Sequence, residues 1–218
     1  MIKKKNQPNI IFLLDKKNDW IGKFLKKNIL NLSKKFNYKI TKNPNSIKNK
    51  IVFVLSYTRI LNTNFILKNK EVLIAHPSKL PRDKGFSPVQ NQILRGQNTI
   101  HVSLIKASKE VDSGPIAFRD KFFLEGHELS DEIREQQAKS IFKLIKKFLN
   151  NYPNINYRKQ KGISTFNKRR GVNANKLNIQ KSIKSQLNIL RISDNENYPA
   201  FFKYRKNTYI LKILKKKF

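Results

Sequence analysis

A histidine at the end of an apolar run is the residue of this chain best suited to proton-transfer chemistry. Residues 71–75, EVLIA, read as a buried strand, and His76 follows directly, before a loop with two prolines and a glycine, PSKLPRDKG. Imidazole can act as a general acid or base near neutral pH, and the carboxyl ends of parallel strands are where ligands bind in open sheets. The strand-end position alone leaves a second interpretation equally open, in which His76 is a structural residue of the core.

Several other chemistries lack the residues that they require. Gly22 is the only glycine before Gly85, so neither a GxGxxG turn nor a P-loop can follow the first predicted strand. No G-x-S-x-G segment supplies a hydrolase nucleophile, and the absence of cysteine excludes disulfides and thiolate chemistry. The histidines His76, His101 and His127 stand far apart without carboxylates at ligand spacing, so we expect no metal site. We interpret His101 and His127 as structural residues.

The elements that would position the histidine follow from three short apolar runs. Residues 10–14, 51–55 and 71–75 are continuous apolar stretches bounded by polar segments, which is typical of strands in a parallel sheet covered on both faces. Apolar residues at near-helical spacing fill residues 20–32, between the first two strands. The pattern is therefore strand, helix, strand, with a right-handed crossover, and it predicts an α/β fold.

A further helix and strand are predicted after the histidine loop. Ser87 can cap the helix, Pro88 suits its first turn, and Gly96 lies just past its end. Residues 99–105, TIHVSLI, first alternate and then run apolar, which predicts a strand.

The last third of the chain is organised differently. A longer helix follows Ser130 and ends before Pro153. Residues 154–178 are polar, basic and weakly patterned, which predicts a linker or a long loop. A helix at about 180–192 and a hairpin turned at 205–207 then follow. We therefore divide the chain into a main domain, a linker and a small C-terminal helix–hairpin subdomain, over residues 1–153, 154–178 and 179–218.

The charge of the chain is extreme but evenly spread. Its formal net charge is +33, and no acidic residue occurs at 21–70 or 136–193. Such an excess favours anionic partners and makes nucleic acid a possible one. Because lysine, asparagine and isoleucine are enriched together and no RNA-binding signature is present, we favour a compositional bias over a nucleic-acid surface. No apolar run reaches about 18 residues, so we predict no membrane-spanning helix. The absence of cysteine fits a cytoplasmic location, which we expect.

Two segments resemble the folate-dependent formyltransferases, a family that includes methionyl-tRNA, glycinamide ribonucleotide and amino-sugar N-formyltransferases. In the first, HPSKLPRDKGFSPVQNQILRG, a strand ends in histidine and a P-S-x-L-P-x-x-x-G loop leads to a short helix. In the second, TIHVSLIKASKEVDSGPI, a strand leads to a loop with aspartate before a small residue and glycine. The matching residues are His76, Pro77, Ser78, Leu80, Pro81, Gly85, Asp112, Ser113 and Gly114.

The resemblance covers about residues 8 to 213, patchily at 16–50 and 156–178. The segments FFLEGHELSDEIREQQ and LRISDNENYPAFFKYRKNTYILKI are similar to the branch that acts on amino sugars of surface glycans, the pseudaminic-acid-type enzymes. The resemblance implies a Rossmann-like, mostly parallel sheet with helices on both faces. It also implies an enzyme that transfers a formyl group from 10-formyltetrahydrofolate, its cofactor, to the amine of a nucleotide-linked amino sugar.

The resemblance also implies roles for particular residues. His76 would move protons between nitrogen centres, and Asp112 would orient it, whereas by itself an aspartate before Ser-Gly would indicate only a turn. The loop at 107–114 would line the slot for the folate pterin. The implied cofactor-binding residues are Leu80, Pro81, Gly85, Lys109, Val111 and Gly114.

One position departs from the family pattern. Ile74 stands two residues before His76, where the family has an asparagine that steadies the developing oxyanion. Loss of one such donor typically lowers the rate by about 10²–10³. Ser78, Gln90, Asn91, a backbone N–H or protonated His76 could replace it. Arg82 and Lys84 could meet an anionic ligand, although exposed charges of this kind are commonly just solvated.

Two alternative functions stay open. Formylation of methionyl-tRNA is encouraged by the charge, but the roughly 60 residues after the main domain are short for the RNA-binding barrel of that subfamily. A catalytically weakened relative that binds folate or sugar is suggested by Ile74. The sequence names neither the sugar nor its carrier, and it leaves the oligomeric state open, a homodimer included.

Overall fold

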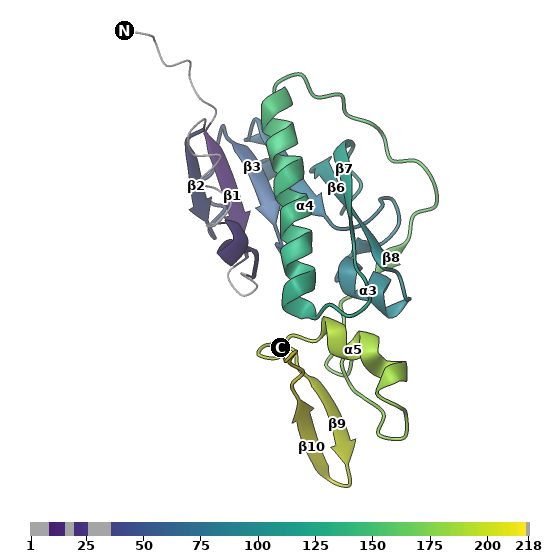
Figure 1. The fold of residues 1–218 in the computed structure, drawn as a ribbon. Helices are drawn as coiled ribbons and strands as arrows, with labels where there is room; N and C mark the ends of the chain where they lie inside the picture. The colour runs from purple at the N-terminus through teal and green to yellow at the C-terminus, as the bar shows by residue number, and fades with distance from the viewer. Residues whose placement is uncertain (1–8, 16–19, 26–35, 217–218) are drawn as a thin grey trace.

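A six-stranded sheet forms the centre of the protein in a computed structural model that describes residues 9–15, 20–25 and 36–216 (Figure 1). The strand order is β2-β1-β3-β4-β6-β7. Strands β2, β1, β3 and β4 run parallel, and β6 and β7 are added antiparallel to β4 and to each other. The strands are β1 (Ile10–Leu14), β2 (Tyr38–Thr41), β3 (Ile51–Leu55), β4 (Glu71–His76), β6 (Thr99–Lys106) and β7 (Ile116–Phe123).

The apolar runs form strands because both faces of the sheet are covered. All five residues of β1 and of β3 are buried. Alternate residues enter two different cores: Phe12 and Phe53 pack on the face of the long helix α4 (Ser130–Asn151), and Leu13 and Val54 pack on the opposite face. The short helix α2 (Thr63–Leu67) covers that opposite face through Phe65. The mostly parallel α/β fold predicted from the sequence is thus confirmed.

Helix α4 lies along one face of the sheet (Figure 1). Its buried stripe includes Ile141, Ile145 and Phe148, and the Phe148 ring meets the Phe53 ring edge-on with centroids 5.6 Å apart. Residues 20–25 are helical, and the buried Ile21 and Leu25 join the same core. The remainder of the predicted helix at 20–32 lies outside the described residues.

Two strands of the six-stranded sheet were not predicted, because their sequences do not have continuous apolar runs. Strand β7, IAFRDKFF, carries charged residues at its centre, and β2, YKIT, is a four-residue edge strand with exposed positions. Strand β6 agrees with the prediction, but it runs antiparallel to β4, with Ile74 opposite Ile105 and His76 opposite Ser103. Because side chains alternate along a strand, these four residues share the face of the sheet that is turned away from α4.

Helix α3 (Pro88–Leu94) follows the histidine loop as predicted, with Pro88 in its first turn and Gly96 past its end at a φ of 78°. Ser87 corrects one expectation. It occupies the position before the helix, but its backbone is left-handed, with a φ of 49°, and its side chain makes no capping hydrogen bond.

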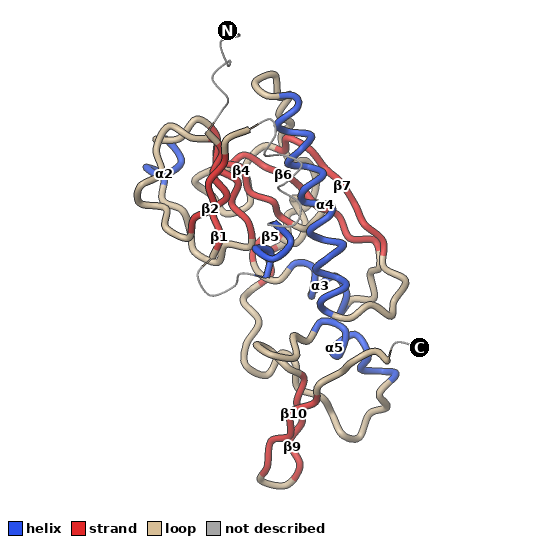
Figure 2. Tube along the Cα trace, turned by 60° about the vertical axis from the view of Figure 1, so that its left-hand side comes forward, coloured by secondary structure: helices blue, strands red, loops and turns tan. Residues whose placement is uncertain are grey.

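The C-terminal unit contains a hairpin of β9 (Ala200–Tyr204) and β10 (Asn207–Leu211), turned where predicted. The hairpin projects away from the sheet in both ribbon and tube views (Figures 1 and 2). The preceding helix is shorter than predicted: a 3₁₀ turn, Lys184–Gln186, leads into α5 (Leu187–Ile192). Residues before it are not helical because the Gln186 side chain binds the backbone of Asn178, which holds that segment in a turn.

Residues between α4 and α5 pass back along the main sheet. The segment between α4 and α5 contains the short strand β8 (Phe166–Asn167). Strand β8 pairs in parallel with β5 (Lys84–Gly85) of the histidine loop. Arg158 pairs with Ile116, at the start of β7, through two backbone hydrogen bonds. Among the described helices, none is long and apolar enough to cross a membrane.

Three ion pairs join the C-terminal unit to α4 and the loop before it, one of them between Lys215 and Glu132 at 2.6 Å. Arg191 is 3% exposed and donates to the Glu128 carboxylate at 3.3 Å and to its carbonyl at 3.2 Å. Arg134 of α4 contacts Asp194 at 2.9 Å. Burial opposes ionisation of Asp194, but hydrogen bonds from Asn197, Glu196 and Arg134 prevail and lower its pKa to about 2.

We expect Arg191→Leu to lower the free energy of unfolding by about 3 kcal/mol, because it leaves the Glu128 carboxylate without its buried partner. Lys212→Met is the matched control, since the Lys212–Glu196 pair at 2.9 Å is exposed, and it should change stability by less than about 1 kcal/mol. Urea unfolding followed by circular dichroism measures both. Equal effects of the two substitutions would contradict the assignment of Arg191 as a buried anchor.

Candidate active site

His76 ends β4 on the face of the sheet turned away from α4, and it is 5% exposed. Its placement follows from the strand: Leu73 and Ala75 point into the core below α4, so Ile74 and His76 point to the other face. There the loop at 77–86 covers the ring.

Asp112 approaches His76 from a separate loop, as predicted. Its Oδ2 lies 3.4 Å from His76 Nδ1 and accepts a hydrogen bond from Gly85 N at 2.8 Å. Asp112 adopts a left-handed φ of 51° and is 8% exposed. Residues 36 positions apart in sequence, on two loops, therefore form one buried pair.

The loop after His76, which we call the ledge (residues 77–86), is held by its own buried polar groups. Ser78 is fully buried and donates to Arg82 O at 2.8 Å, while Ser103 donates to Ser78 O at 2.7 Å. Leu80 packs beneath the ledge in a small apolar cluster with Ile74, Ile105 and Ile116. Gln92 of α3 donates to Pro77 O at 2.9 Å. Hydrogen bonds from β6 and from α3 therefore hold the ledge in place.

The second nitrogen of His76 faces a backbone carbonyl of the ledge. His76 Nε2 lies 2.8 Å from Asp83 O. Asp83, whose φ is 58°, is fixed in turn by its carboxylate, which accepts from Arg95 at 2.8 Å and from Asn167 at 2.9 Å. Its N–H donates to Thr165 at 2.8 Å. Asp83 could not be found from its residue type, because its contribution to His76 is a main-chain oxygen.

Both His76 ring nitrogens thus face oxygen acceptors. A neutral imidazole has one N–H and can satisfy only one of them, whereas the imidazolium donates from both nitrogens. The two acceptors therefore hold the ring from both of its nitrogens and fix its orientation.

A segment that we call the strap (residues 157–167) contacts both loops of the pair. Gln160 Nε2 donates to Asp112 O at 2.8 Å and to Gly114 O at 2.9 Å, and Thr165 pairs with the ledge through Lys84 N at 2.9 Å. Tyr157 donates to Glu71 at 3.0 Å. The strap was predicted as part of a linker, because its polar residues carry no periodic pattern. The sequence reasoning missed Gln160, Thr165 and Asn167 for that reason.

The residues that the resemblance implies for cofactor binding differ in their exposure to solvent. Lys109 and Val111 are exposed, Val111 to 42%, whereas Leu80 and Pro81 are buried. Gly114 is required by space, since a Cβ there would lie 1.7 Å from Lys106 O. Lys84 ties the ledge to this loop through Ser113 at 2.8 Å. Gly85 packs closely against Phe166 and Asn167 and has a φ of 85°.

The candidates for an oxyanion donor differ in whether their side-chain donors are already used in hydrogen bonds. Ser78 donates to Arg82 O, and Asn91 Nδ2 donates to Phe86 O at 3.2 Å. Gln90 is half-buried and forms no side-chain hydrogen bond with the described part of the chain. Ile74 is committed to the apolar cluster beneath Leu80.

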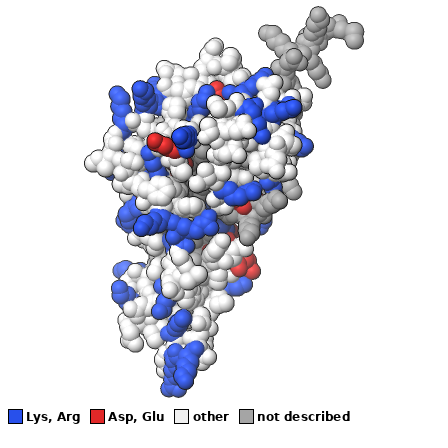
Figure 3. Space-filling view, turned by 180° about the vertical axis from the view of Figure 1, so that it is seen from behind, with Lys and Arg blue, Asp and Glu red and all other residues white. Residues whose placement is uncertain are grey.

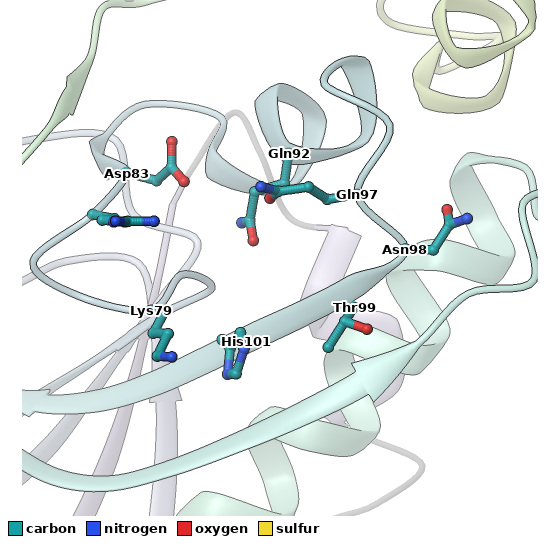
Figure 4. A pocket seen from close by; sticks show the side chains of 8 residues that line it. Lys79, Asp83, Gln92, Gln97, Asn98, Thr99 and His101 are labelled. Atoms are coloured by element: carbon teal, nitrogen blue, oxygen red, sulfur yellow. The ribbon is translucent and has the colours of Figure 1, made fainter.

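A hollow of about 380 Å³ lies between the ledge, α3 and β6 (Figure 4). It is lined by Lys79, Arg82, Asp83, Gln92, Gln97, Asn98, Thr99 and His101. His76 and Asp112 do not line it. His101 was interpreted as a satisfied structural residue, but its ring forms no hydrogen bond within the described segments and faces the hollow. Burial lowers the pKa of His101, and the cations Lys79, Lys121 and Arg119 lower it further.

The remaining expectations concern charge, metals and His127. On the face drawn in Figure 3, lysine and arginine are spread along the molecule rather than gathered in one patch. No cluster of three potential metal ligands occurs among the described residues. His127 lies in the loop before α4, where its ring contacts Glu125 at 2.9 Å and Lys215 at 2.9 Å.

Comparison with known proteins shows the family. The family described as formyl transferase matches residues 2–146, more than half of the 218-residue chain. The methionyl-tRNA formyltransferase of Thermotoga maritima is 29% identical over 105 residues, which are 48% of this chain and 34% of that protein. The chain spans about a third of the length of such curated relatives. It belongs to the formyl transferase family.

Solved structures share the fold over nearly the whole chain. A methionyl-tRNA formyltransferase from Clostridium thermocellum has a TM-score of 0.80 and 25% identity, covering 96% of this chain and 94% of that one. A sugar N-formyltransferase from a Shewanella species has a TM-score of 0.71 and 15% identity, covering 97% and 99%. HypX from Aquifex aeolicus, in complex with tetrahydrofolic acid, has a TM-score of 0.80 and 17% identity, covering 95% and 38%.

We expect Gln160→Leu to lower the free energy of unfolding by about 1–3 kcal/mol, because it removes the donor shared by the carbonyls of Asp112 and Gly114. The amide of Gly85 should also exchange its hydrogen faster, since its acceptor is the Asp112 carboxylate. Lys159→Leu, at an exposed neighbouring position, should stay within about 0.5 kcal/mol. Urea unfolding and hydrogen exchange read out both variants; an unchanged Gly85 amide in Gln160→Leu would argue against a strap that positions Asp112.

Proposed function

We propose that this member of the formyl transferase family transfers a formyl group from 10-formyltetrahydrofolate to the amine of a nucleotide-linked amino sugar, with His76 and Asp112 at the centre of the reaction. The observation that carries the proposal is the buried pair itself, with Nδ1 and Oδ2 3.4 Å apart at the carboxyl end of β4. In open α/β sheets ligands bind at such strand ends.

The amino-sugar acceptor agrees with the extent of the structural match, and the resemblance of residues 190–213 to the amino-sugar branch supports it. The Shewanella sugar N-formyltransferase corresponds to this chain over 99% of its own length, so the helix–hairpin unit is included. The curated methionyl-tRNA formyltransferases extend far beyond the matched part.

The loop at 107–114 suits a planar ring such as a pterin. Val111 offers exposed apolar surface beside the buried Asp112 and Gly114. The Gln160 side chain is fixed through its Nε2, which donates to two carbonyls. Its Oε1 is a buried acceptor without a partner in the described structure. A pterin carries N–H donors that such an acceptor could bind. We assign the donor's ring to Lys109, Val111 and Gly114, with Gly85 at its edge, and the rigid support to Leu80 and Pro81.

When bound, 10-formyltetrahydrofolate would supply the formyl carbon to the amine nitrogen, and its own nitrogen would exchange the bond to that carbon for the proton that the amine loses. His76 is the group that carries this proton. Asp112 holds Nδ1, which leaves Nε2 as the exchanging atom once Asp83 O moves aside. The imidazolium also places positive charge beside the oxygen that becomes negative, in place of the donor that Ile74 lacks.

Methionyl-tRNA is the second candidate acceptor. It is favoured by the Clostridium thermocellum structure, which matches along 94% of its length at 25% identity. The two candidates share the donor and the His76–Asp112 pair, so only the acceptor distinguishes them.

The first test offers the purified chain formyl-folate together with UDP-, dTDP-, GDP- and CMP-linked amino sugars and, separately, methionyl-tRNA. We expect a mass gain of one formyl group on one nucleotide sugar. Formylation of methionyl-tRNA alone would replace the proposed acceptor. Folate binding without transfer to any amine would show that the protein binds folate but is not a formyltransferase.

His76→Gln and Asp112→Asn should each lower the rate of formyl transfer, His76→Gln by about 10²–10⁴, because a positioned general acid–base group contributes that much. His127→Gln is the matched control, since the exposed ring of His127 lies outside the site, and its rate should stay within about twofold. Single-turnover rates by mass spectrometry provide the measurement, with circular dichroism to verify folding. Full activity in His76→Gln would remove His76 from the mechanism.

Ile74→Asn tests whether the missing donor limits the enzyme. The amide enters an apolar cluster, so stability should fall by about 1–3 kcal/mol. We expect no gain in rate if His76 already serves the oxyanion. A large gain in the rate of Ile74→Asn would instead identify the wild-type protein as a weakened relative.

A further inference from the structure

The polar groups of Asp83 are bound by three different parts of the structure. Its N–H donates to Thr165 Oγ1 of the strap at 2.8 Å, and its carbonyl oxygen lies 2.8 Å from His76 Nε2. Its carboxylate accepts from Arg95, just past α3, at 2.8 Å and from Asn167 of the strap at 2.9 Å. The residue whose carbonyl meets the His76 ring is therefore held from α3 and from the strap at once.

The backbone of Asp83 needs such support. Its φ is 58°, in the left-handed region that residues with a Cβ seldom adopt, although aspartate and asparagine tolerate it better than most. Such conformations persist where the surroundings determine them. The next residue is also fixed, since Lys84 N donates to Thr165 O at 2.9 Å. The direction of the Asp83 carbonyl thus depends on contacts with other segments rather than on the local backbone preference.

The contact with Arg95 is the one that brings α3 into this arrangement. Arg95 Nη2 lies 2.8 Å from each oxygen of the Asp83 carboxylate. The Arg95 side chain is 46% exposed, whereas that of Asp83 is 14% exposed. Ion pairs with an exposed partner commonly contribute little to stability. We therefore expect the effect of this pair at the carbonyl that Asp83 turns toward His76, rather than in the stability of the fold.

We propose that Arg95 is a positioning residue for formyl transfer and acts through Asp83 on the His76 ring. The inference rests on the proposed function, and it adds a residue next to α3 to that site. A ring held at both nitrogens cannot turn without breaking both contacts. If the Asp83 carbonyl drifts, the ring is held only by the longer contact with Asp112, at 3.4 Å. A misplacement of about 1 Å can lower a rate about a hundredfold.

The opposite role for the same contact is a brake. In the proposed reaction the amine takes the place of Asp83 O at His76 Nε2, so the carbonyl must withdraw. A brake would make the reaction faster when Asp83 is loosened. A positioning contact makes it slower, because the ring must already have the correct orientation when the carbonyl withdraws. The two roles therefore differ in the sign of the effect on the rate.

Arg95→Met (R95M) removes the ion pair and keeps the apolar stem of the side chain. We expect kcat for formyl transfer to fall by about tenfold, because the ring loses part of its orientation. The KM values should stay within about twofold. Arg95→Lys, which keeps a cation for the Asp83 carboxylate, should recover most of the rate. Steady-state kinetics with formyl-folate and the acceptor that gains a formyl group in the mass-spectrometric screen provide the measurement.

Arg205→Met (R205M) is the matched control, because Arg205 is exposed at the turn of the hairpin. Its rate should stay within about twofold of wild type, and the urea midpoints of both variants should stay close to that of wild type. An unchanged kcat in R95M, an equal loss in R205M, a loss confined to KM or a faster reaction in R95M would each overturn the proposal. The last result would identify the Asp83 carbonyl as a brake.

Asp83→Ala tests whether Arg95 acts through Asp83. The substitution removes the carboxylate, so R95M should have no further effect on the rate in that background. Alanine is strained in a left-handed backbone, but the strain is common to D83A and D83A/R95M and cancels in their comparison. A loss in D83A/R95M relative to D83A that equals the loss in R95M alone would contradict an action through Asp83.

The His76 ring gives a readout that does not need formyl transfer. A hydrogen on Nε2 that is bonded to Asp83 O should exchange slowly with water, and its NMR signal is assigned by its loss in His76→Gln. We expect this exchange to be several-fold faster in R95M than in wild type or R205M, without folate or amine. An unchanged exchange in R95M would overturn the positioning role whatever the acceptor. Absence of transfer in the wild type, with faster exchange in R95M, would refute only the proposed reaction.

Discussion

The structure of the site depends on one constraint: the His76 ring is held between two oxygen atoms that come from different loops. Asp112 Oδ2 lies at Nδ1 and Asp83 O at Nε2, at 3.4 and 2.8 Å. The ring is 5% exposed, so water does little to replace either contact. Because an acceptor lies at each ring nitrogen, the surroundings fix the orientation of the ring. Errors of about 1 Å in such groups can lower rates about a hundredfold.

Most of the neighbouring structure maintains that constraint. The ledge is fixed beneath by Leu80 in its apolar cluster, and above by the strap, which pairs with Lys84 and Asp83. The same strap binds the Asp112 loop through Gln160. Two loops from different strands thus share one support, and neither can shift alone. Gly114 and Gly85 permit the close approach of backbone that this support needs.

The sequence predicted the parts of this arrangement that leave a local pattern. The strands at 10–14, 51–55 and 71–75 are continuous apolar runs, and the two segments that resemble the formyltransferases predicted that His76 and Asp112 act together. The strap left no such pattern, because its contribution is made by single polar side chains and main-chain pairs over more than 40 intervening residues. Strand β7 was missed because its outward face is charged. His101 was misread because a half-buried histidine on an alternating strand looks structural until its surroundings are known.

Asp83 explains how the two faces of the ledge are coupled. Its left-handed backbone, with a φ of 58°, turns the carbonyl toward His76 while the carboxylate reaches Arg95 and Asn167 beside the hollow. A ligand that moved the carboxylate would also move the carbonyl, because one residue carries both. In the proposed reaction, Nε2 must be released from that carbonyl before it can exchange a proton with the amine. Because Asp83 also lines the hollow, the residue whose carbonyl oxygen contacts His76 is in direct reach of whatever enters that volume, and the position of the His76 ring depends on how this one residue is held.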